Sequence, residues 1–387
     1  MTQSSRSPLD FLWFIPSAGD NRYLSHPDTD RAPTPAYLRE IAVAADRLGY
    51  YGTLLPTGAH CADAWITAAS IAPFTERLKL LVALRPGLTA PAEAVRQAAA
   101  LDRLSNGRAL VNVVTGGSPQ ALAADGLFLD HQARYEQTDE FLSIWRQLAS
   151  GETVTQEGKY LSIRKGRLLF PFVQKPHAPI YFGGSSDIAR DIAAEHADVY
   201  LAWGEPPHQL RDVFEDVRAR AANRGRNIRF GVRLHIIVRE TEGAAWDAAN
   251  DLLRYVSDDA IAAFQATMAK GSDSVGQARM SALHGGKREN LEISPNLWAG
   301  IGLVRTGAGT ALVGDADTIA ARLQEYADIG VDTIVASGYP HLEEAYRVAE
   351  LLFPKLKLTH PTTDTRLDFH SISPSFAPPP SVMASVR

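Results

Sequence analysis

The stretch that decides the fold reads Val331-Asp332-Thr333-Ile334-Val335-Ala336-Ser337-Gly338-Tyr339-Pro340-His341. Residues 331–336 are mostly apolar and predict a buried strand, and the next helix is predicted to begin at Leu342. A phenol and an imidazole, those of Tyr339 and His341, therefore follow the C-terminal end of a late strand. Barrel enzymes carry their catalytic side chains at this end of the strands, so the stretch predicts both a strand–helix repeat and a site.

The same alternation of short apolar runs and helical patterns continues through most of the chain. The expected strands are Phe11–Ile15, Gly52–Leu55, Leu78–Leu84, Ala109–Val114, Ile180–Phe182, Val199–Ala202, Arg229–Val238 and Val331–Ala336. The expected helices are Pro35–Leu48, Ala64–Phe74, Pro91–Leu104, Tyr135–Leu148, Asp187–Glu195, Pro207–Asn223, Ala244–Val256 and Ala316–Ile329. Such a repeat predicts a (β/α)8 barrel. A doubly wound sheet is the main alternative, but it usually carries a glycine-rich dinucleotide fingerprint, which this chain lacks.

Two segments interrupt the repeat, and a third follows it. We expect residues 1–358 to form a single barrel with insertions near 149–175 and 257–309. The first insertion contains three glycines and predicts a β-excursion. The second is long, and a long insertion between barrel elements predicts a mobile lid over the site. Residues 359–387 form a Pro- and Ser-rich tail, expected to be disordered or to wrap over a neighbouring subunit.

Composition excludes several classes of protein. The 387 residues carry a formal net charge of -5 and no run of Lys and Arg, which argues against a nucleic-acid partner. The single cysteine, Cys61, excludes an intrachain disulfide and fits a reducing compartment. The apolar run Phe11–Ile15 is too short for a signal peptide, and no run reaches the roughly 18 apolar residues of a membrane span. We therefore expect a cytoplasmic protein without a membrane partner.

Two cationic side chains stand on one face of a predicted strand. Arg233 and His235 alternate along residues 229–238, so Leu234 and Ile236 would face the helices. A barrel interior is packed, so inward cations must meet a ligand, a carboxylate or the open mouth. An anion site is therefore one interpretation, and an internal salt bridge or a solvated strand end is the other.

Two further residues extend the anion hypothesis. Arg305 lies in the glycine-rich segment 302–309, which can move, although a loop charge on the surface is an equal alternative. Trp203 ends another predicted strand and is either core or a pocket wall. Together with Tyr339 and His341, these residues predict a pocket that holds an anion and manages protons around it.

A possible phosphate site follows the fifth predicted strand. In Phe182-Gly183-Gly184-Ser185-Ser186-Asp187 two glycines let backbone approach a ligand, and two hydroxyls stand near a helix N-terminus, which favours anions. Ordinary helix capping by Ser186 or Asp187 is the alternative. Asn112, followed by Thr115 and two glycines, makes a second loop of this type.

Other chemistry is absent from the sequence. Cys61 has only His60 nearby to lower its thiol pKa, so we expect a small packed residue and no nucleophile. There is no His-Glu-x-x-His motif, no cysteine pair for zinc, no Walker lysine and no Gly-x-Ser-x-Gly elbow. No metal site is predicted.

Longer motifs carry a family resemblance. They are Leu48–Gly52, Pro56–Gly58, Val82–Pro86, Leu101–Arg108, Phe182–Ser186, Trp203–Pro207, Asn290–Trp298 and Ser337–Glu344. Together they resemble the alkanesulfonate monooxygenases of the bacterial-luciferase superfamily, over a match from about Phe11 to Pro354. The resemblance implies a (β/α)8 barrel with insertions and a mobile lid. It also implies that reduced FMN comes from a separate NAD(P)H-dependent flavin reductase and that O2 is the co-substrate. The carbon–sulfur bond of an organosulfonate is then cleaved to an aldehyde and sulfite.

The resemblance also assigns roles to residues, and it implies a homodimer or homotetramer. The sulfonate site is implied for Trp203, Arg233, His235, Arg305, Tyr339 and His341. Of these, Arg233, His235, Arg305 and Tyr339 are expected to be catalytic, with Tyr339 or His235 as the acid and Arg305 on the lid. Flavin contacts are implied for Cys61, Asn112, Tyr135, Ser185 and Ser186.

One position departs from the family pattern. The family has Pro-Thr-His-Gly-Asp after the first strand, and this chain has Pro16-Ser17-Ala18-Gly19-Asp20. Ala18 removes an imidazole from the expected pocket floor, which would admit a bulkier, more hydroxylated substrate such as the sulfosugar sulfoquinovose. Neutral drift compensated by water is the alternative. Two other functions stay open: a deazaflavin-dependent dehydrogenase on the same scaffold and a non-catalytic flavin- or sulfonate-binding protein.

Overall fold

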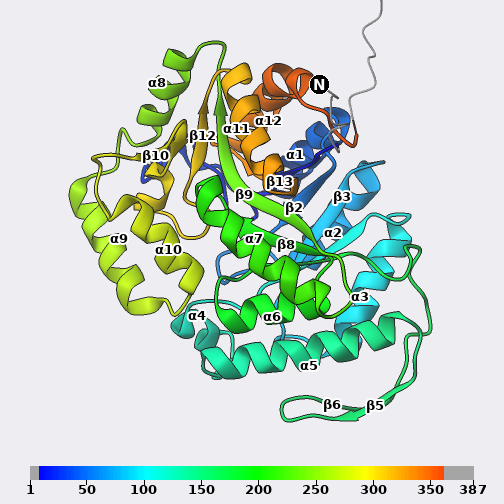
Figure 1. The fold of residues 1–387 in the computed structure, drawn as a ribbon. Helices are drawn as coiled ribbons and strands as arrows, with labels where there is room; N and C mark the ends of the chain where they lie inside the picture. Colours follow the sequence, from blue (N-terminus) through cyan, green and yellow to red (C-terminus); the bar gives the residue numbers. More distant parts are fainter. Residues whose placement is uncertain (1–7, 361–387) are drawn as a thin grey trace, which may run out of the picture.

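The computed structural model describes residues 8–360, and its centre is a closed ring of parallel strands (Figure 1). The ring strands are β1 (Asp10–Phe14), β2 (Gly52–Leu55), β3 (Lys79–Leu84), β4 (Ala109–Val113), β7 (Ile180–Phe182), β8 (Val199–Trp203), β9 (Arg229–Val238) and β13 (Val331–Ser337). β8 closes the ring by pairing with β9, and β13 lies between β9 and β1. The predicted (β/α)8 barrel is confirmed, and its strands are the eight that the apolar runs predicted.

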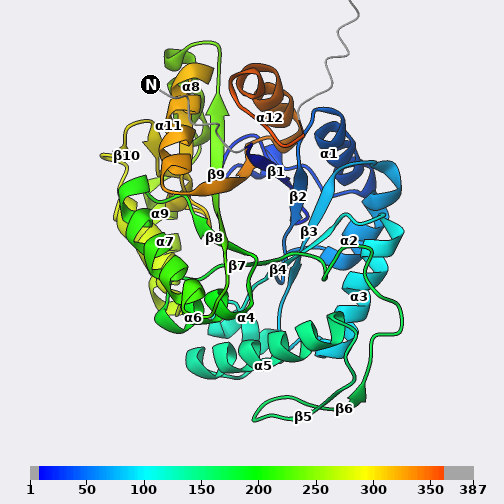
Figure 2. The same cartoon turned by 45° about the vertical axis from the view of Figure 1, so that its right-hand side comes forward.

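Helices surround this ring on its outer side (Figure 2). They are α1 (Pro35–Arg47), α2 (Ala64–Ile71), α3 (Pro91–Leu104), α4 (Pro119–Ala124), α5 (His131–Ala149), α6 (Asp187–His196), α7 (Pro207–Ala222), α8 (Glu242–Leu252), α11 (Ala316–Asp328) and α12 (His341–Arg347). α1 shows why they form: Thr34 caps its first turn, and Leu38, Ile41, Ala42 and Ala45 repeat at helical spacing and are buried against the barrel. α5 begins four residues before the predicted start because Asp130 caps it.

Both faces of the ring are covered, which explains the continuous apolar runs of its strands. Leu12, Leu54, Leu81 and Leu110 fill the interior of the barrel. Their neighbours along the strands pack outward against the helices in one large cluster. Because side chains alternate between the two faces of a strand, every second residue points into the barrel and the residues between them point towards the helices.

The two insertions form structure of their own. Residues 149–175 contain the antiparallel hairpin β5 (Val154–Glu157) and β6 (Ser162–Gly166). Residues 257–309 contain α9 (Asp258–Gly271), α10 (Val275–His284), β10 (Glu292–Ser294) and β11 (Leu297–Trp298). β12 (Ala311–Gly314), which the sequence pattern missed, pairs in parallel with the far half of β9. β10 and β11 then extend the sheet from β12.

The two ends of the described chain lie together. Leu9 bridges Leu358, and its backbone bonds Lys357 and Thr359, at the N-terminal end of β1. Residues 361–387, nearly all of the expected tail, lie outside the described residues. Within residues 8–360 no helix combines the length and apolar character needed to cross a bilayer.

Candidate active site

Strand register places Arg233 at the C-terminal mouth of the barrel. Leu12 pairs with Val335, Val335 with Arg233, and Arg233 with Trp203 across neighbouring strands. Paired residues of parallel strands share a face, and Leu12 and Val335 lie in the interior cluster. Arg233 and Trp203 therefore face the interior, whereas Leu234 lies in the helix-facing core.

Arg233 has no ionic partner within the described part of the chain. Its guanidinium carbon lies 4.4 Å from the centre of the Phe14 ring, and its buried Nε has no hydrogen-bond partner. Burial lowers the pKa of Arg233 to about 10; Tyr339 opposes this shift and Arg305 adds to it. The group is still charged at neutral pH. A half-buried cation whose buried Nε lacks a partner is costly, so this arrangement favours binding of an anion.

His235, two residues further along β9, is held at both ring nitrogens. Nδ1 lies 2.9 Å from Oγ of Ser337, and Nε2 lies 3.1 Å from the carbonyl oxygen of Ala308. Burial lowers the pKa of His235 well below its ordinary value, and the charges of Arg233, His341 and Arg305 act in the same direction. The ring is therefore neutral at neutral pH, and neither nitrogen is free for a substrate in this arrangement.

Aromatic contacts bring three more predicted residues to the same place. The Tyr339 and His235 rings are stacked, with centroids 5.3 Å apart and planes inclined by 20°. The guanidinium carbon of Arg305 lies 5.5 Å from the centre of the Tyr339 ring, and the His341 ring meets Tyr339 edge-on at 5.1 Å. The loop bearing Arg305 also reaches Arg233: a Cβ added at Gly307 would lie 3.8 Å from Nη1 of Arg233. The residues expected at the sulfonate site thus converge on the mouth.

Asp20 supports this group, and the sequence argument gave it no role. Its carboxylate accepts the His341 backbone N–H at 2.7 Å, contacts Nδ1 of His341 at 2.7 Å and accepts the Tyr37 hydroxyl at 2.6 Å. Burial acts to raise the pKa of Asp20, but the bonds and charge from His341, together with Tyr37, lower it below its ordinary value. Asp20 therefore fixes both the His341 ring and the start of α12. Its place in the Pro16–Asp20 motif was the available signal.

Ala18 and Cys61 lie at the rim of the mouth. Ala18 is exposed in the turn after β1, so its side chain lies open to solvent and not on a buried floor. Cys61 is half-buried; burial raises the pKa of its thiol, against opposing effects of Ser17, Arg85 and Arg305. A protonated thiol agrees with the expectation that Cys61 is no nucleophile, and its neighbours place it near the Arg305 loop.

The residues expected to hold a flavin phosphate lie on the β4 and β7 side. Ser186 caps α6 through the Ala189 N–H, so the capping alternative is confirmed for this residue. The Tyr135 hydroxyl lies beside Ser186 and Thr115, and burial raises its pKa. The Thr115 hydroxyl is buried without a hydrogen-bond partner among the described residues. Hydroxyl groups gathered at a helix N-terminus fit a phosphate monoester.

The two other expected cofactor residues border this place. Asn112 pairs with Tyr181 and faces the interior of the barrel, in the half-buried layer next to the mouth. A Cβ added at Gly276 of α10 would lie 3.4 Å from the Ser185 hydroxyl and 3.5 Å from the Trp203 ring. The second insertion therefore lies close to one residue of the expected phosphate site, Ser185, and to one of the expected sulfonate site, Trp203.

The second insertion is fastened over the mouth by polar contacts that the sequence did not predict. Arg134 of α5 donates two hydrogen bonds to Asp273, at 2.9 and 2.7 Å. Within the insertion itself, Gln277 of α10 accepts the Gly307 backbone N–H at 2.9 Å and so ties α10 to the loop that bears Arg305. These partners lie more than 25 residues apart in the chain, so local patterns carry no signal for them.

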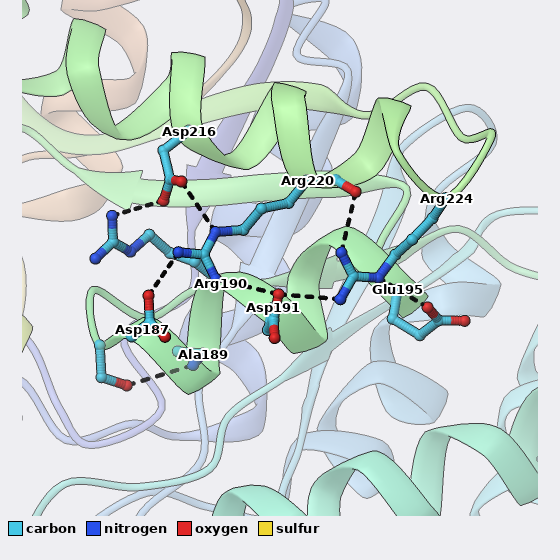
Figure 3. A network of polar contacts seen from close by, with 9 residues as sticks. Asp187, Ala189, Arg190, Asp191, Glu195, Asp216, Arg220 and Arg224 are labelled. Carbon is cyan, nitrogen blue, oxygen red and sulfur yellow. Dashed lines mark hydrogen bonds and ion pairs between the residues drawn. The ribbon is translucent and has the colours of Figure 1, made fainter.

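A second concentration of charge lies outside the barrel, between α6 and α7 (Figure 3). Arg220 contacts Asp187, Asp191 and Asp216 at 2.5, 3.1 and 2.9 Å. Arg224 continues the network to Asp191 and Glu195, at 3.0 Å each. Each arginine here has carboxylate partners, so the network fastens two helices and offers no unpaired charge.

The fold and the mouth together define a class: a (β/α)8 barrel with arginine, histidine and aromatic side chains gathered at the C-terminal ends of its strands. Comparison with models of protein families identifies the family to which the chain belongs. A model described as luciferase-like monooxygenase matches residues 9–333, and the chain belongs to this family.

Solved structures share the fold at low sequence identity. A long-chain alkane monooxygenase (LadA) is 20% identical with a TM-score of 0.73, over 92% of this chain and 91% of that chain. DmoA from Hyphomicrobium sulfonivorans is 18% identical with a TM-score of 0.72, over 91% and 88%. A coenzyme F420-dependent tetrahydromethanopterin reductase from Methanopyrus kandleri is 17% identical with a TM-score of 0.66, over 91% and 100%. These likenesses establish the architecture, which LadA and DmoA share with a coenzyme F420-dependent reductase.

Proposed function

We propose that the protein is a two-component, FMNH2-dependent monooxygenase that cleaves the carbon–sulfur bond of organosulfonates, releasing an aldehyde and sulfite. The observation that carries the proposal is the charge at the mouth. Arg233 is half-buried, its buried Nε has no hydrogen-bond partner and no carboxylate pairs with it among the described residues, and Arg305 lies against the Tyr339 ring. A sulfonate is a fixed monoanion whose oxygens suit planar guanidinium groups.

The residues at the mouth would divide the work as follows. Arg233 and Arg305 bind the sulfo group and offset the charge that develops on it as sulfite leaves. The Tyr339 ring contacts both Arg305 and His235, so its phenol is the group we propose for proton transfer. The loop around Gly307, held over Arg233 and Trp203, excludes water from the bound substrate.

The cofactor would be reduced FMN, delivered by a separate NAD(P)H-dependent reductase. Ser185, Ser186 and Tyr135 would hold its phosphate, with Asn112 and Cys61 towards the ring. When bound, FMNH2 supplies the electrons that activate O2. We further propose that the protein acts in the cytoplasm as a homodimer or homotetramer.

Substrate scope has two candidates. Alkanesulfonates fit the charge of the mouth with no further requirement. Sulfoquinovose is the second candidate, because Ala18 leaves an open, methyl-sized side chain at the rim where the family pattern has an imidazole.

The decisive experiment measures sulfite release with an added flavin reductase, NAD(P)H and FMN. Alkanesulfonates of rising chain length are compared with sulfoquinovose, each with and without O2. Sulfite that depends on FMN, reductase and O2 is expected. Sulfite formed under strict anaerobiosis would remove the monooxygenase proposal. Turnover of an alcohol with deazaflavin in the absence of O2 would favour a dehydrogenase on the same scaffold.

A further inference from the structure

We propose that His235 is a positioning residue, whose neutral ring holds the loop of residues 304–309 against β9 and so sets the place of Arg305. The proposal deepens the proposed function, because Arg305 is the residue we assign to the sulfo group. It differs from the expectation that His235 donates a proton to the substrate.

The hydrogen bonds of His235 define which ring nitrogen carries the hydrogen. A carbonyl oxygen can only accept, so the contact of 3.1 Å between Nε2 and the Ala308 oxygen requires a hydrogen on Nε2. In a neutral ring Nδ1 then accepts, and the Ser337 hydroxyl at 2.9 Å is its donor. Ser337 and His235 are register partners on β13 and β9, so the sheet itself fixes this distance.

The surroundings keep the ring neutral. Three cationic or titratable groups face it: Arg233 from its own strand, His341 from α12 and Arg305 from the loop. Tyr339 stacks on its face. Burial and these charges lower the pKa of His235 well below its ordinary value, which makes a second proton on the ring unfavourable at neutral pH.

The loop has a second anchor, which comes from α10. The Gly307 N–H donates to Gln277 of α10 at 2.9 Å, and the Ala308 carbonyl accepts from His235. Arg305 and Thr306, just before these two anchors, are exposed, whereas Ala308 is buried. These two hydrogen bonds therefore hold residues 307 and 308 in place, and Arg305 lies in the exposed part of the loop that directly precedes them.

Arg305 is linked to the anchor through a shared ring. Its guanidinium carbon lies 5.5 Å from the centre of the Tyr339 ring, and the same ring stacks on His235. If Nε2 handed its hydrogen to a substrate, the Ala308 bond would break and the loop would lose this anchor. The Nε2 hydrogen of His235 therefore cannot bond the Ala308 carbonyl and be transferred to a substrate at the same time.

Limited digestion with trypsin tests the proposal without any activity measurement. Arg305 is an exposed trypsin site, and cleavage there leaves a new N-terminus at Thr306. His235→Leu removes the donor and leaves the Ala308 carbonyl unpaired, so we expect cleavage after Arg305 to be about tenfold faster. His235→Gln places an amide N–H in nearly the same position and should restore a rate within about threefold of the parent. Arg164 on the β6 hairpin is an internal control, because its side chain is 84% exposed and far from the loop in the chain.

Two outcomes would overturn the proposal. One is an unchanged rate after Arg305 in His235→Leu while cleavage after Arg164 is also unchanged. The other is a rate in His235→Gln as fast as in His235→Leu. If His235→Leu fails to fold, Ser337→Ala replaces it: loss of the Nδ1 partner should speed cleavage after Arg305 about threefold, and an unchanged rate counts against the proposal.

Kinetics with the sulfonate substrate add a second, independent reading. A positioning role predicts that His235→Leu raises KM for the sulfonate and that His235→Gln recovers most of this loss. Equal loss of kcat in both variants, with KM unchanged, would assign the proton to His235 instead. Because digestion needs no substrate, an inactive parent protein would count against the proposed function alone.

Discussion

Two groups of arginines in this protein have opposite surroundings. Between α6 and α7, the guanidinium of Arg220 contacts three carboxylates, each within 3.1 Å (Figure 3). At the barrel mouth Arg233 has an aromatic ring below it, an arginine nearby and an Nε without a partner. Both groups are built from the same side chain on the same scaffold.

The difference teaches how a structural arginine and a binding arginine are distinguished. A half-exposed arginine with several carboxylates gains little net stability from each, since water competes for both partners. A buried arginine without carboxylates costs folding free energy and is tolerated where a ligand completes its coordination. An arginine therefore indicates a candidate binding site when its guanidinium lacks carboxylate partners in the folded protein. An arginine whose guanidinium already has such partners does not.

The largest effect is expected for Arg233→Ala. Loss of a charge-assisted, two-pronged contact to the sulfo group should lower kcat/KM about a thousandfold. The midpoint of urea unfolding should stay the same or rise, because an unpaired buried cation is removed. Steady-state sulfite release and urea titrations measure the two quantities. Arg233→Lys is the matched control and should recover only part of the turnover, since its ammonium cannot make the fork. Full activity in the alanine variant would show that the mouth is not the site.

Asp20→Asn should have the next largest effect, on stability. The amide loses acceptor capacity towards His341 and Tyr37, so we expect the free energy of unfolding at pH 7 to fall by about 2 kcal/mol. Folding lowers the pKa of Asp20 below its ordinary 3.8, so its ionic contribution is present above that pH and is lost as the pH falls through it. The difference between parent and variant in urea unfolding should therefore stay constant from pH 6 down to about pH 4 and shrink only below that pH. A difference that grows on acidification would contradict this assignment.

Arg220→Ala should affect stability slightly and turnover not at all. Its side chain is 24% exposed and bridges α6 and α7, so the expected loss is about 1 kcal/mol, and less at high salt. Urea unfolding at low and at 0.5 M salt, together with sulfite release, would check both statements. A large loss of turnover would mean that the α6–α7 pair positions the phosphate residues at the start of α6, and the contrast with Arg233 would then fail.

The smallest effect is expected for Arg164→Ala. Arg164 and Glu157 pair at 3.3 Å across the β5–β6 hairpin with side chains 84% and 75% exposed. Exposed pairs of this kind contribute almost nothing, so neither Tm nor kcat/KM should change measurably. A clear fall in Tm would show that hairpin charges matter in an assembly that a single chain does not reveal.

The sequence predicted the barrel because each ring strand is covered on both faces and most of the surrounding helices, such as α1, α5 and α6, begin at a capping side chain. It missed β12, which pairs with the C-terminal end of β9. β12 has only four residues, and so short a run has no recognisable hydrophobic pattern. For the site, alternation along β9 was enough to place Arg233 and His235 on the inner face. The Asp20–His341 contact joins residues 321 positions apart, so only the folded chain can bring it about.

The protonation state of His235 was also beyond the sequence. An imidazole next to arginines could be an acid, a base or neither. Its tautomer depends on a carbonyl at Ala308 and a hydroxyl at Ser337, which reach it from two different segments. Residue type and spacing indicated where chemistry would gather, and the distances of these partners indicated what each group could do.

The bridge between Leu9 and Leu358 has a practical consequence for engineering. The first and last described residues lie side by side at the N-terminal ends of the barrel strands, opposite the mouth. A protein domain joined to residue 8 or to residue 360 would begin on that side, and it would need a linker long enough to pass around the barrel to reach the mouth. A circular permutant that joins these ends and opens the chain at the Lys159 turn should keep the ring of strands closed, because no barrel strand is cut.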